Sequence, residues 1–127
     1  MATPKPSAAS DADTISDRTI LNFALNLEYL EAEFYSYAVP GEGLPDDMTH
    51  GTGHRGPVEG GRQVAFQSRS IRQFAAEIAR DEHEHVAFFR SALGSAAVAR
   101  PAINIRQSFT DAALAAGLIK VKETFGV

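Results

Sequence analysis

The stretch "EIARDEHEHVAFFRSALG", residues 77–94, combines the periodicity of a buried helix with a cluster of acids and histidines. Apolar residues recur at helical spacing over about residues 64–93, and Gly94 is a natural end, so we predict a helix there. Glu82 lies in the middle of the apolar stripe and His85 lies beside it, three positions later. The stripe consists of Ile71, Phe74, Ala75, Ile78, Val86, Phe89, Ala92 and Leu93. The helix is therefore predicted to carry a carboxylate and an imidazole on its inward face.

A second long helix is predicted over about residues 16–39, which contain neither Pro nor Gly. Glu28 falls at the centre of its apolar stripe, and Glu31 and Tyr35 fall within it. The stripe consists of Ile20, Leu21, Ala24, Leu25, Leu27, Ala32, Phe34, Ala38 and Val39. The opposite face holds Asn22, Asn26, Tyr29, Glu33 and Ser36, which we expect to be the outer side.

Three inward acids on two helices call for a counter-charge. Burying an ionised carboxylate without a partner costs several kcal/mol, and neither stripe contains an Arg or Lys. A metal ion supplies the charge, and carboxylate oxygens with a neutral imidazole suit Fe, Mn or Zn. We therefore predict metal ligation by Glu28, Glu31, Glu82 and His85, with Tyr35 in a catalytic role that hydrogen-bonds a ligand or transfers an electron. The alternative is ordinary structure, because a single inward Glu more often partners a buried Arg and a lone Glu-x-x-His motif arises by chance.

Between the two helices lies a segment rich in Gly and Pro, residues 40–63, which is predicted to be a long loop. His50 and His54 lie there near Asp46 and Asp47 and offer a second metal site, although a solvated loop is the favoured interpretation. A short third helix is expected over about residues 108–120. Because strand signals are absent, the predicted class is all-α.

Composition limits the remaining possibilities. The chain has 127 residues, of which 44% are hydrophobic and 22% charged, and its net charge of −4 offers no basic surface for nucleic acid. No apolar run approaches the ~20 residues of a membrane span. Residues 1–13 are predicted to be a flexible extension and residues 14–127 a single domain. A cytoplasmic location is the default expectation, with a secreted or processed form as the alternative.

The two helices resemble a known superfamily. "LNLEYLEAEFYSYA" in the first helix and "EIARDEHEHVAFFRSALG" in the second are similar to the ferritin-like superfamily. With "AVARP", they most resemble the ferritin-like domain family that includes the desiccation-related proteins. The resemblance covers about residues 18–127 and implies a four-helix bundle with a di-metal centre, in which Glu28 is the single-Glu ligand, Glu82 the bridging Glu and His85 the histidine. Tyr35 matches a tyrosine common near the ferritin oxidation site.

This chain supplies two matching Glu and one His, where a complete centre of this kind requires four Glu and two His. The expected fold is a helical hairpin, half of a four-helix bundle, completed by a missing C-terminal half or by pairing into a homodimer or higher oligomer. The resemblance implies iron binding with ferroxidase or peroxide-detoxifying activity, linked to stress or desiccation protection. Two alternatives stay open: a non-enzymatic stress-protective protein with a vestigial metal site, and an assembly subunit that docks onto another protein.

Overall fold

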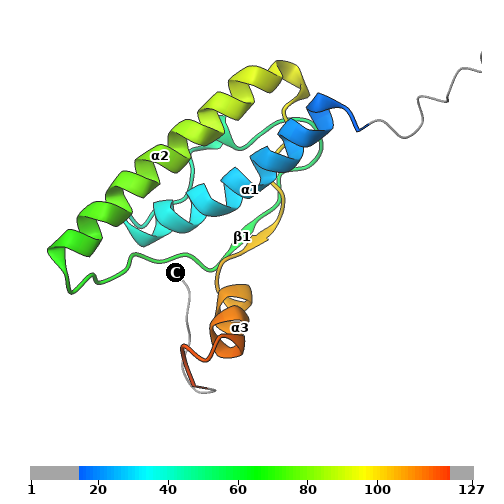
Figure 1. The fold of residues 1–127 in the computed structure, drawn as a ribbon. Helices are drawn as coiled ribbons and strands as arrows, with labels where there is room; N and C mark the ends of the chain where they lie inside the picture. The colour runs from blue at the N-terminus through cyan, green and yellow to red at the C-terminus, as the bar shows by residue number, and fades with distance from the viewer. Residues whose placement is uncertain (1–14, 121–127) are drawn as a thin grey trace, which may run out of the picture.

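The computed structural model describes residues 15–120, and the extension predicted over residues 1–13 lies outside them. Two long antiparallel helices lie side by side and dominate the fold (Figure 1). The elements, in chain order, are α1 (Asp17–Ala38), η2 (Asp46–Met48), β1 (Val58–Glu59), α2 (Arg69–Leu93), η3 (Gly94–Ala96), β2 (Ile103–Asn104) and α3 (Gln107–Ala115). The strands among the described residues, β1 and β2, are only two residues long each and pair in parallel. The rest of the regular structure is helical, so the all-α prediction is confirmed.

Serine side chains define where both long helices begin. Ser16 accepts a hydrogen bond from the backbone N–H of Thr19, and Ser68 accepts one from that of Ile71, as N-cap residues do. α2 therefore begins at Arg69, five residues after the predicted start. Val64, where the helix was predicted to begin, is not helical, because its backbone N–H donates to the Ala38 carbonyl at the end of α1. α2 ends where predicted, at Gly94, whose φ is 55°.

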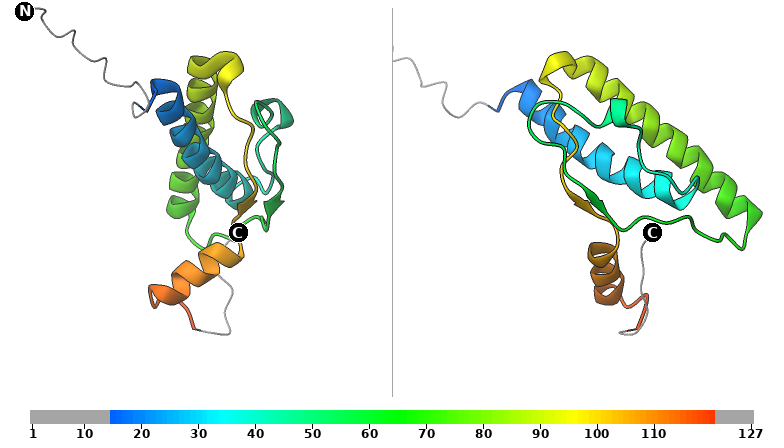
Figure 2. Two further views of the ribbon diagram at one scale, coloured as in Figure 1. Left: turned by 90° about the vertical axis from the view of Figure 1, so that its right-hand side faces the viewer. Right: turned by 180° about the vertical axis from the view of Figure 1, so that it is seen from behind.

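The loop between the helices covers one side of the hairpin together with the chain that follows α2. These segments lie behind the helix pair in Figure 1 and in front of it in the right-hand view of Figure 2. They bury the face of α1 that carries Tyr29, Glu33 and Ser36. The prediction that this face is the outer side is therefore wrong. Apolar periodicity missed it because the polar groups of Tyr29 and Glu33 find partners in distant parts of the chain.

A buried ion pair fastens this covering layer to α1. Arg100 pairs with Glu33, whose side chain is fully buried, and also donates to the Gly56 carbonyl at 2.7 Å. The second Glu33 carboxylate oxygen accepts the Leu44 N–H at 3.1 Å. The arginine that neutralises this acid thus comes from outside both helices, so the helical stripes alone give no sign of it.

A second arginine makes a similar connection from α2. Arg90 donates to the Tyr29 hydroxyl at 2.7 Å and to the His50 carbonyl at 2.8 Å. The Tyr29 hydroxyl in turn donates to the Val98 carbonyl at 3.1 Å. Glycine permits the closest approach in this layer, because a Cβ at Gly56 would lie 2.1 Å from the Ala102 nitrogen. The Gly/Pro-rich segment is therefore a packed layer over α1.

The other side of the hairpin has no such layer within residues 15–120. Six large hydrophobic side chains of the two helices are 48–67% exposed, namely Ile20, Phe23, Leu27, Ile71, Phe74 and Phe88. Several of these belong to the stripes predicted to face inward, so the structure leaves those stripes only partly covered.

Helix α3 follows β2 and lies below β1 in Figure 1, beside the helix pair. The Asn104 side chain accepts hydrogen bonds from three backbone N–H groups at its start, and Phe109 stacks on Phe34 of α1 with ring centroids 4.7 Å apart. α3 ends at Ala115, short of the predicted residue 120, close to Gly117 with its φ of 71°. None of the helices in the described chain is long and apolar enough to span a membrane.

Candidate metal centre

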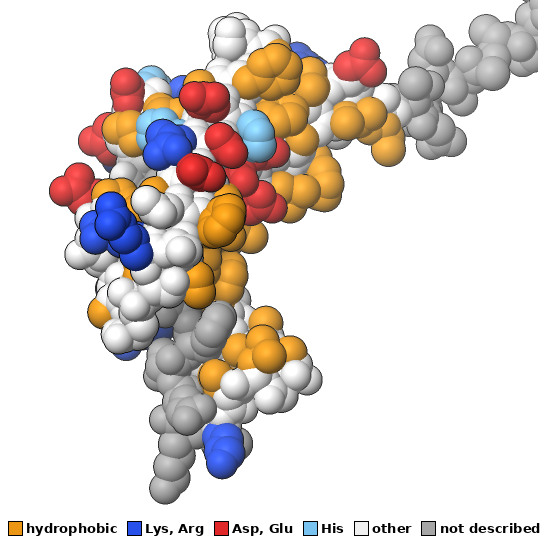
Figure 3. Space-filling model, turned by 60° about the vertical axis from the view of Figure 1, so that its left-hand side comes forward, with side chains coloured by type: hydrophobic (Ala, Val, Ile, Leu, Met, Phe, Trp, Pro, Cys, Tyr) orange, Lys and Arg blue, Asp and Glu red, His pale blue; other side chains and the backbone are white. Residues whose placement is uncertain are grey.

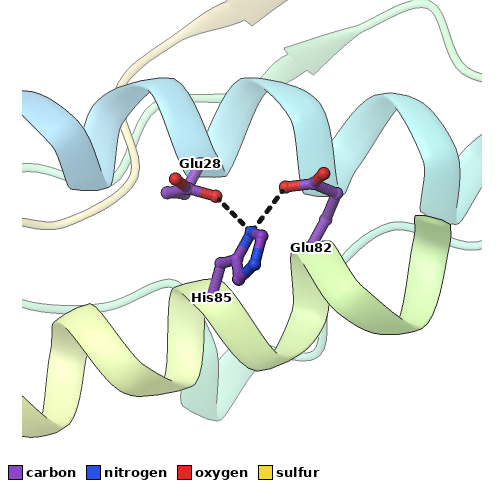
Figure 4. A group of neighbouring side chains, drawn as sticks. All are labelled: Glu28, Glu82 and His85. Atoms are coloured by element: carbon purple, nitrogen blue, oxygen red, sulfur yellow. Dashed lines mark hydrogen bonds and ion pairs between the residues drawn. The ribbon is translucent and has the colours of Figure 1, made fainter.

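Three of the predicted ligands come together between the long helices. Glu28 comes from α1, and Glu82 and His85 come from adjacent turns of α2 (Figure 4). One potential ligand atom from each lies within 4.8 Å of the other two. Among residues 15–120 this is the one group of three or more acidic, histidine or cysteine side chains with that geometry. The spacing of three positions places Glu82 and His85 on one face of α2, and the packing of α1 against α2 brings Glu28 to them.

The three side chains contact one another directly. His85 Nδ1 lies 3.1 Å from Glu28 Oε2 and 3.2 Å from Glu82 Oε2. Ionised carboxylate oxygens only accept hydrogen bonds, so a protonated Nδ1 donates to this pair. Two carboxylates on either side of one ring nitrogen attract a cation. That cation can be a proton on the nitrogen or a metal ion bound by all three groups.

Burial and charge shift the proton affinities of the group. Burial is the largest cause that raises the pKa of Glu82 above its ordinary value, and the hydrogen bond with Glu28 adds to it. The hydrogen bond to Glu82 is the largest cause that raises the pKa of His85, although burial opposes it. The side chains are 20%, 11% and 54% exposed for Glu28, Glu82 and His85 respectively, so the histidine is the member open to solvent. Access to the site is therefore from the uncovered side of the hairpin.

The other predicted site residues lie outside this group. Glu31 is exposed, contrary to the expectation that it faces inward, and it is not among the three clustered ligands. Tyr35 is half-buried and packs edge-on against Phe34, with ring centroids 5.3 Å apart. In the loop, His50 Nδ1 lies 2.9 Å from the Asp46 carbonyl, and the Asp46 carboxylate pairs with Arg55. The loop residues thus form local contacts and no metal-type cluster within the described chain.

The residues that fasten the covering layer to the face of α1 opposite the ligands were not predicted from the sequence. Glu33 and Tyr29 hold the covering layer on the face of α1 turned away from the ligands, through Arg100 and Arg90. The available signal was the arginine of "AVARP", a lone charge in an otherwise apolar segment. Its partner could not be named without the fold, because 67 residues separate Glu33 and Arg100.

The donor set fits a divalent transition metal. Two carboxylates and one imidazole match the oxygen and nitrogen ligands preferred by iron, manganese and zinc. Three donors leave coordination positions free, as at a site that also takes water, substrate or further protein ligands. The fold and this group together define a ferritin-like helical hairpin with a candidate carboxylate–histidine metal site.

Sequence comparison gives the same class. The family model described as "Ferritin-like domain" matches residues 16–127, and the chain belongs to this family. A desiccation-related protein of Craterostigma plantagineum is 40% identical over 78 residues, which make up 61% of this chain and 25% of that protein. The chain thus spans about a quarter of the length of the relative it matches. No solved structure matches.

Proposed function

We propose that this protein binds a divalent transition metal, iron in the first place and manganese or zinc as alternatives, through Glu28, Glu82 and His85. The observation that carries the proposal is the convergence of these three side chains from two helices, with their potential ligand atoms within 4.8 Å of one another. The predicted fourth ligand, Glu31, plays no part in this set.

The contrast between two buried acids of α1 and α2 supports a metal. Glu33 is fully buried and has Arg100 as its counter-charge. Glu82 is also buried, but its ion-pair partner in the described chain is His85, which is neutral above its own pKa. Burial of a carboxylate beside a second carboxylate is unfavourable unless a cation is present. A bound metal ion provides one.

Iron bound here would supply one-electron redox chemistry, which underlies the ferroxidase or peroxide-detoxifying activity included in the proposal. The residues of this chain hold and neutralise the metal: the carboxylates of Glu28 and Glu82 provide charge, and His85 provides a neutral donor. Tyr35, two helical turns after Glu28 on α1, is proposed as a hydrogen-bonding or electron-transferring group. A role in stress or desiccation protection is proposed from the name of the plant relative. A cytoplasmic location is proposed only as the default.

Thermal unfolding with and without metal tests the binding. A metal that binds only the folded chain stabilises it by about 2.7 kcal/mol when its free concentration is 100 times Kd. Wild-type protein should therefore melt at a higher temperature with Mn²⁺ or anaerobic Fe²⁺, and Glu82→Ala should not respond. Oxygen uptake after Fe²⁺ addition then separates binding from turnover. Equal melting temperatures for wild type with and without metal would end the proposal.

One observation favours a second candidate, a stress-protective protein with a vestigial site. His85 already contacts both carboxylates, so a protonated imidazolium can neutralise the group without metal. This candidate predicts that adding or removing metal leaves the melting temperature unchanged, whereas acidification below neutral pH stabilises the cluster. The same unfolding experiment therefore decides between the two candidates.

A further inference from the structure

We infer that a pocket between the covering layer and the C-terminal end of α2 binds the phosphate group of a small phosphorylated molecule, with Arg90 as the main recognition group. The pocket has a volume of about 440 Å³, which is typical of small-molecule sites. Its lining includes Arg90, His50, Thr52, Ser95, Gly51 and Gly94. It shares no residue with the candidate metal centre, so the inference goes beyond the proposed function and does not depend on it.

Backbone contacts between two distant segments form the pocket. The Thr52 N–H donates to the Ala97 carbonyl at 2.9 Å, and the Thr52 carbonyl accepts the Ala99 N–H at 2.9 Å. Gly51 permits this approach, because a Cβ there would lie 2.4 Å from the Ala97 carbonyl oxygen. The space at the Cβ position of Gly94 is open, which leaves room beside the end of α2. The pocket is therefore held open by backbone that the covering layer fixes in place.

Arg90 brings a positive charge without a counter-charge to this pocket. Residues 15–120 contain two half-buried arginines, Arg90 and Arg100. Arg100 pairs with Glu33, whereas no carboxylate of the described chain lies within ion-pair distance of Arg90. The contacts of Arg90 are a tyrosine hydroxyl and two loop carbonyls, all of which are neutral. The pocket consequently keeps a net positive charge, which attracts an anion.

Two N–H groups of Arg90 also lack an acceptor within the described chain. A guanidinium has five N–H donors, and the three contacts of Arg90 use two on Nη1 and one on Nη2. The Nε–H and one Nη2–H remain. They are open to solvent, because Arg100 Nε is the one buried side-chain nitrogen or oxygen without a partner in residues 15–120. Nε and Nη2 lie side by side on the guanidinium, so they offer the fork that binds two oxygens of one phosphate or carboxylate.

His50 favours a phosphate over a carboxylate. Its Nδ1 lies 2.9 Å from the Asp46 carbonyl, which only accepts hydrogen bonds, so the neutral ring carries its proton on Nδ1. Its Nε2 is then an acceptor without a donor in the described chain. Near neutral pH a phosphate group often retains one proton, so it offers oxygens to the guanidinium and a hydroxyl to Nε2. An ionised carboxylate has no such hydroxyl.

The charges of the molecule separate this pocket from the metal-type site. On the face seen in Figure 3, acidic side chains gather with histidines beside hydrophobic side chains, and such a face repels anions. No acidic side chain is among the residues that line the Arg90 pocket, and the carboxylate of nearby Asp46 is paired with Arg55. The net charge of −4 disfavours a long polyanion such as nucleic acid, so a small molecule is the better fit.

NMR titration of ¹⁵N-labelled protein with inorganic phosphate and with glucose 6-phosphate tests the inference. A chelator is present, so that no metal ion mediates the binding. The backbone amides of residues 50–52 and 94–97 should shift and saturate with both ligands, whereas glucose and an equal ionic strength of chloride should leave them unchanged. Sulfate, which has no proton for His50 Nε2, should bind about tenfold more weakly than phosphate. Equal affinity for sulfate would contradict phosphate recognition.

Two variants decide whether the pocket itself binds the phosphate. Ser95→Asp places a negative charge at the pocket and should weaken binding about tenfold or more, whereas Ser70→Asp adds the same charge at the opposite end of α2 and should not change it. Arg90→Lys keeps the charge but loses the fork, and should also weaken binding about tenfold. The exposed Ser95 keeps the test valid if Arg90→Lys unfolds. Absence of saturable shifts in wild type, or unchanged binding by Ser95→Asp, would overturn the inference.

Discussion

Replacement of Arg100 by Met should destabilise the fold more than any other charge removal among the pairs described. Arg100→Met leaves the fully buried carboxylate of Glu33 without its counter-charge, and its other described contact is the Leu44 N–H. Breaking a buried ion pair from one side costs about 3–5 kcal/mol. Since domains are stable by about 5–15 kcal/mol, the variant should lose a large part of its stability. The melting temperature should fall by roughly 10–20 °C, at about 4 °C per kcal/mol for a domain of this size.

Chemical denaturation of three variants measures this effect. Arg100→Met combined with Glu33→Leu should recover part of the loss, because an apolar pair can replace a buried ion pair, and the remaining cost of about 1–3 kcal/mol comes from the unpaired Leu44 N–H. Asp46→Ala is the control: its ion pair with Arg55 is exposed and is worth at most ~1 kcal/mol. The reasoning is refuted if Arg100→Met costs less than about 1 kcal/mol, or if the double variant is no more stable than the single one.

Three further predictions concern the covering layer and the site. Gly56→Ala should cost about 2 kcal/mol or more by denaturant titration, since its Cβ would meet the Ala102 backbone; a midpoint equal to that of wild type would refute this. Tyr29→Phe should cost about 1–3 kcal/mol, because Arg90 loses a buried acceptor; an unchanged midpoint would contradict this. The metal-free chain should lose stability as the pH rises above 6.5 and through the raised folded pKa of His85, because the stabilising contribution of the protonated imidazole disappears as the group loses its proton. His85→Gln should flatten this slope, and a profile identical to wild type would count against the reasoning.

The helix pair could be predicted from the sequence because its signals are local. Helical periodicity, the absence of Pro and Gly from residues 16–39 and the glycine after α2 predicted α1 and the end of α2 to within one or two residues, whereas the start of α2 was placed five residues too early. The spacing of Glu82 and His85 fixes their common face whatever the rest of the chain does, and the match of Glu28 to the family pattern supplied the partner from α1. These parts needed no knowledge of distant contacts.

The covering layer could not be predicted for the opposite reason. Glu33 and Tyr29 have the polar character of a solvent-facing surface, and only residues about 60–70 positions away make their burial favourable. Glu31 lies four positions after Leu27, which is 48% exposed, so it is exposed on the uncovered side of the hairpin, and its predicted role as a ligand stays a prediction. Apolar periodicity therefore identifies a helix well, but it does not identify a buried face whose polar side chains find their partners far along the chain.

Metal titration of matched glutamate variants tests the central claim most directly. Glu28→Gln and Glu31→Gln remove the same charge from the same helix, but only Glu28 belongs to the cluster with Glu82 and His85. With anaerobic Fe²⁺ or Mn²⁺, followed by elemental analysis of the desalted protein, wild type and Glu31→Gln should hold the same amount of metal. Glu28→Gln should hold little or none. Equal metal content in all three proteins, or its loss in Glu31→Gln alone, would contradict a metal site at Glu28, Glu82 and His85.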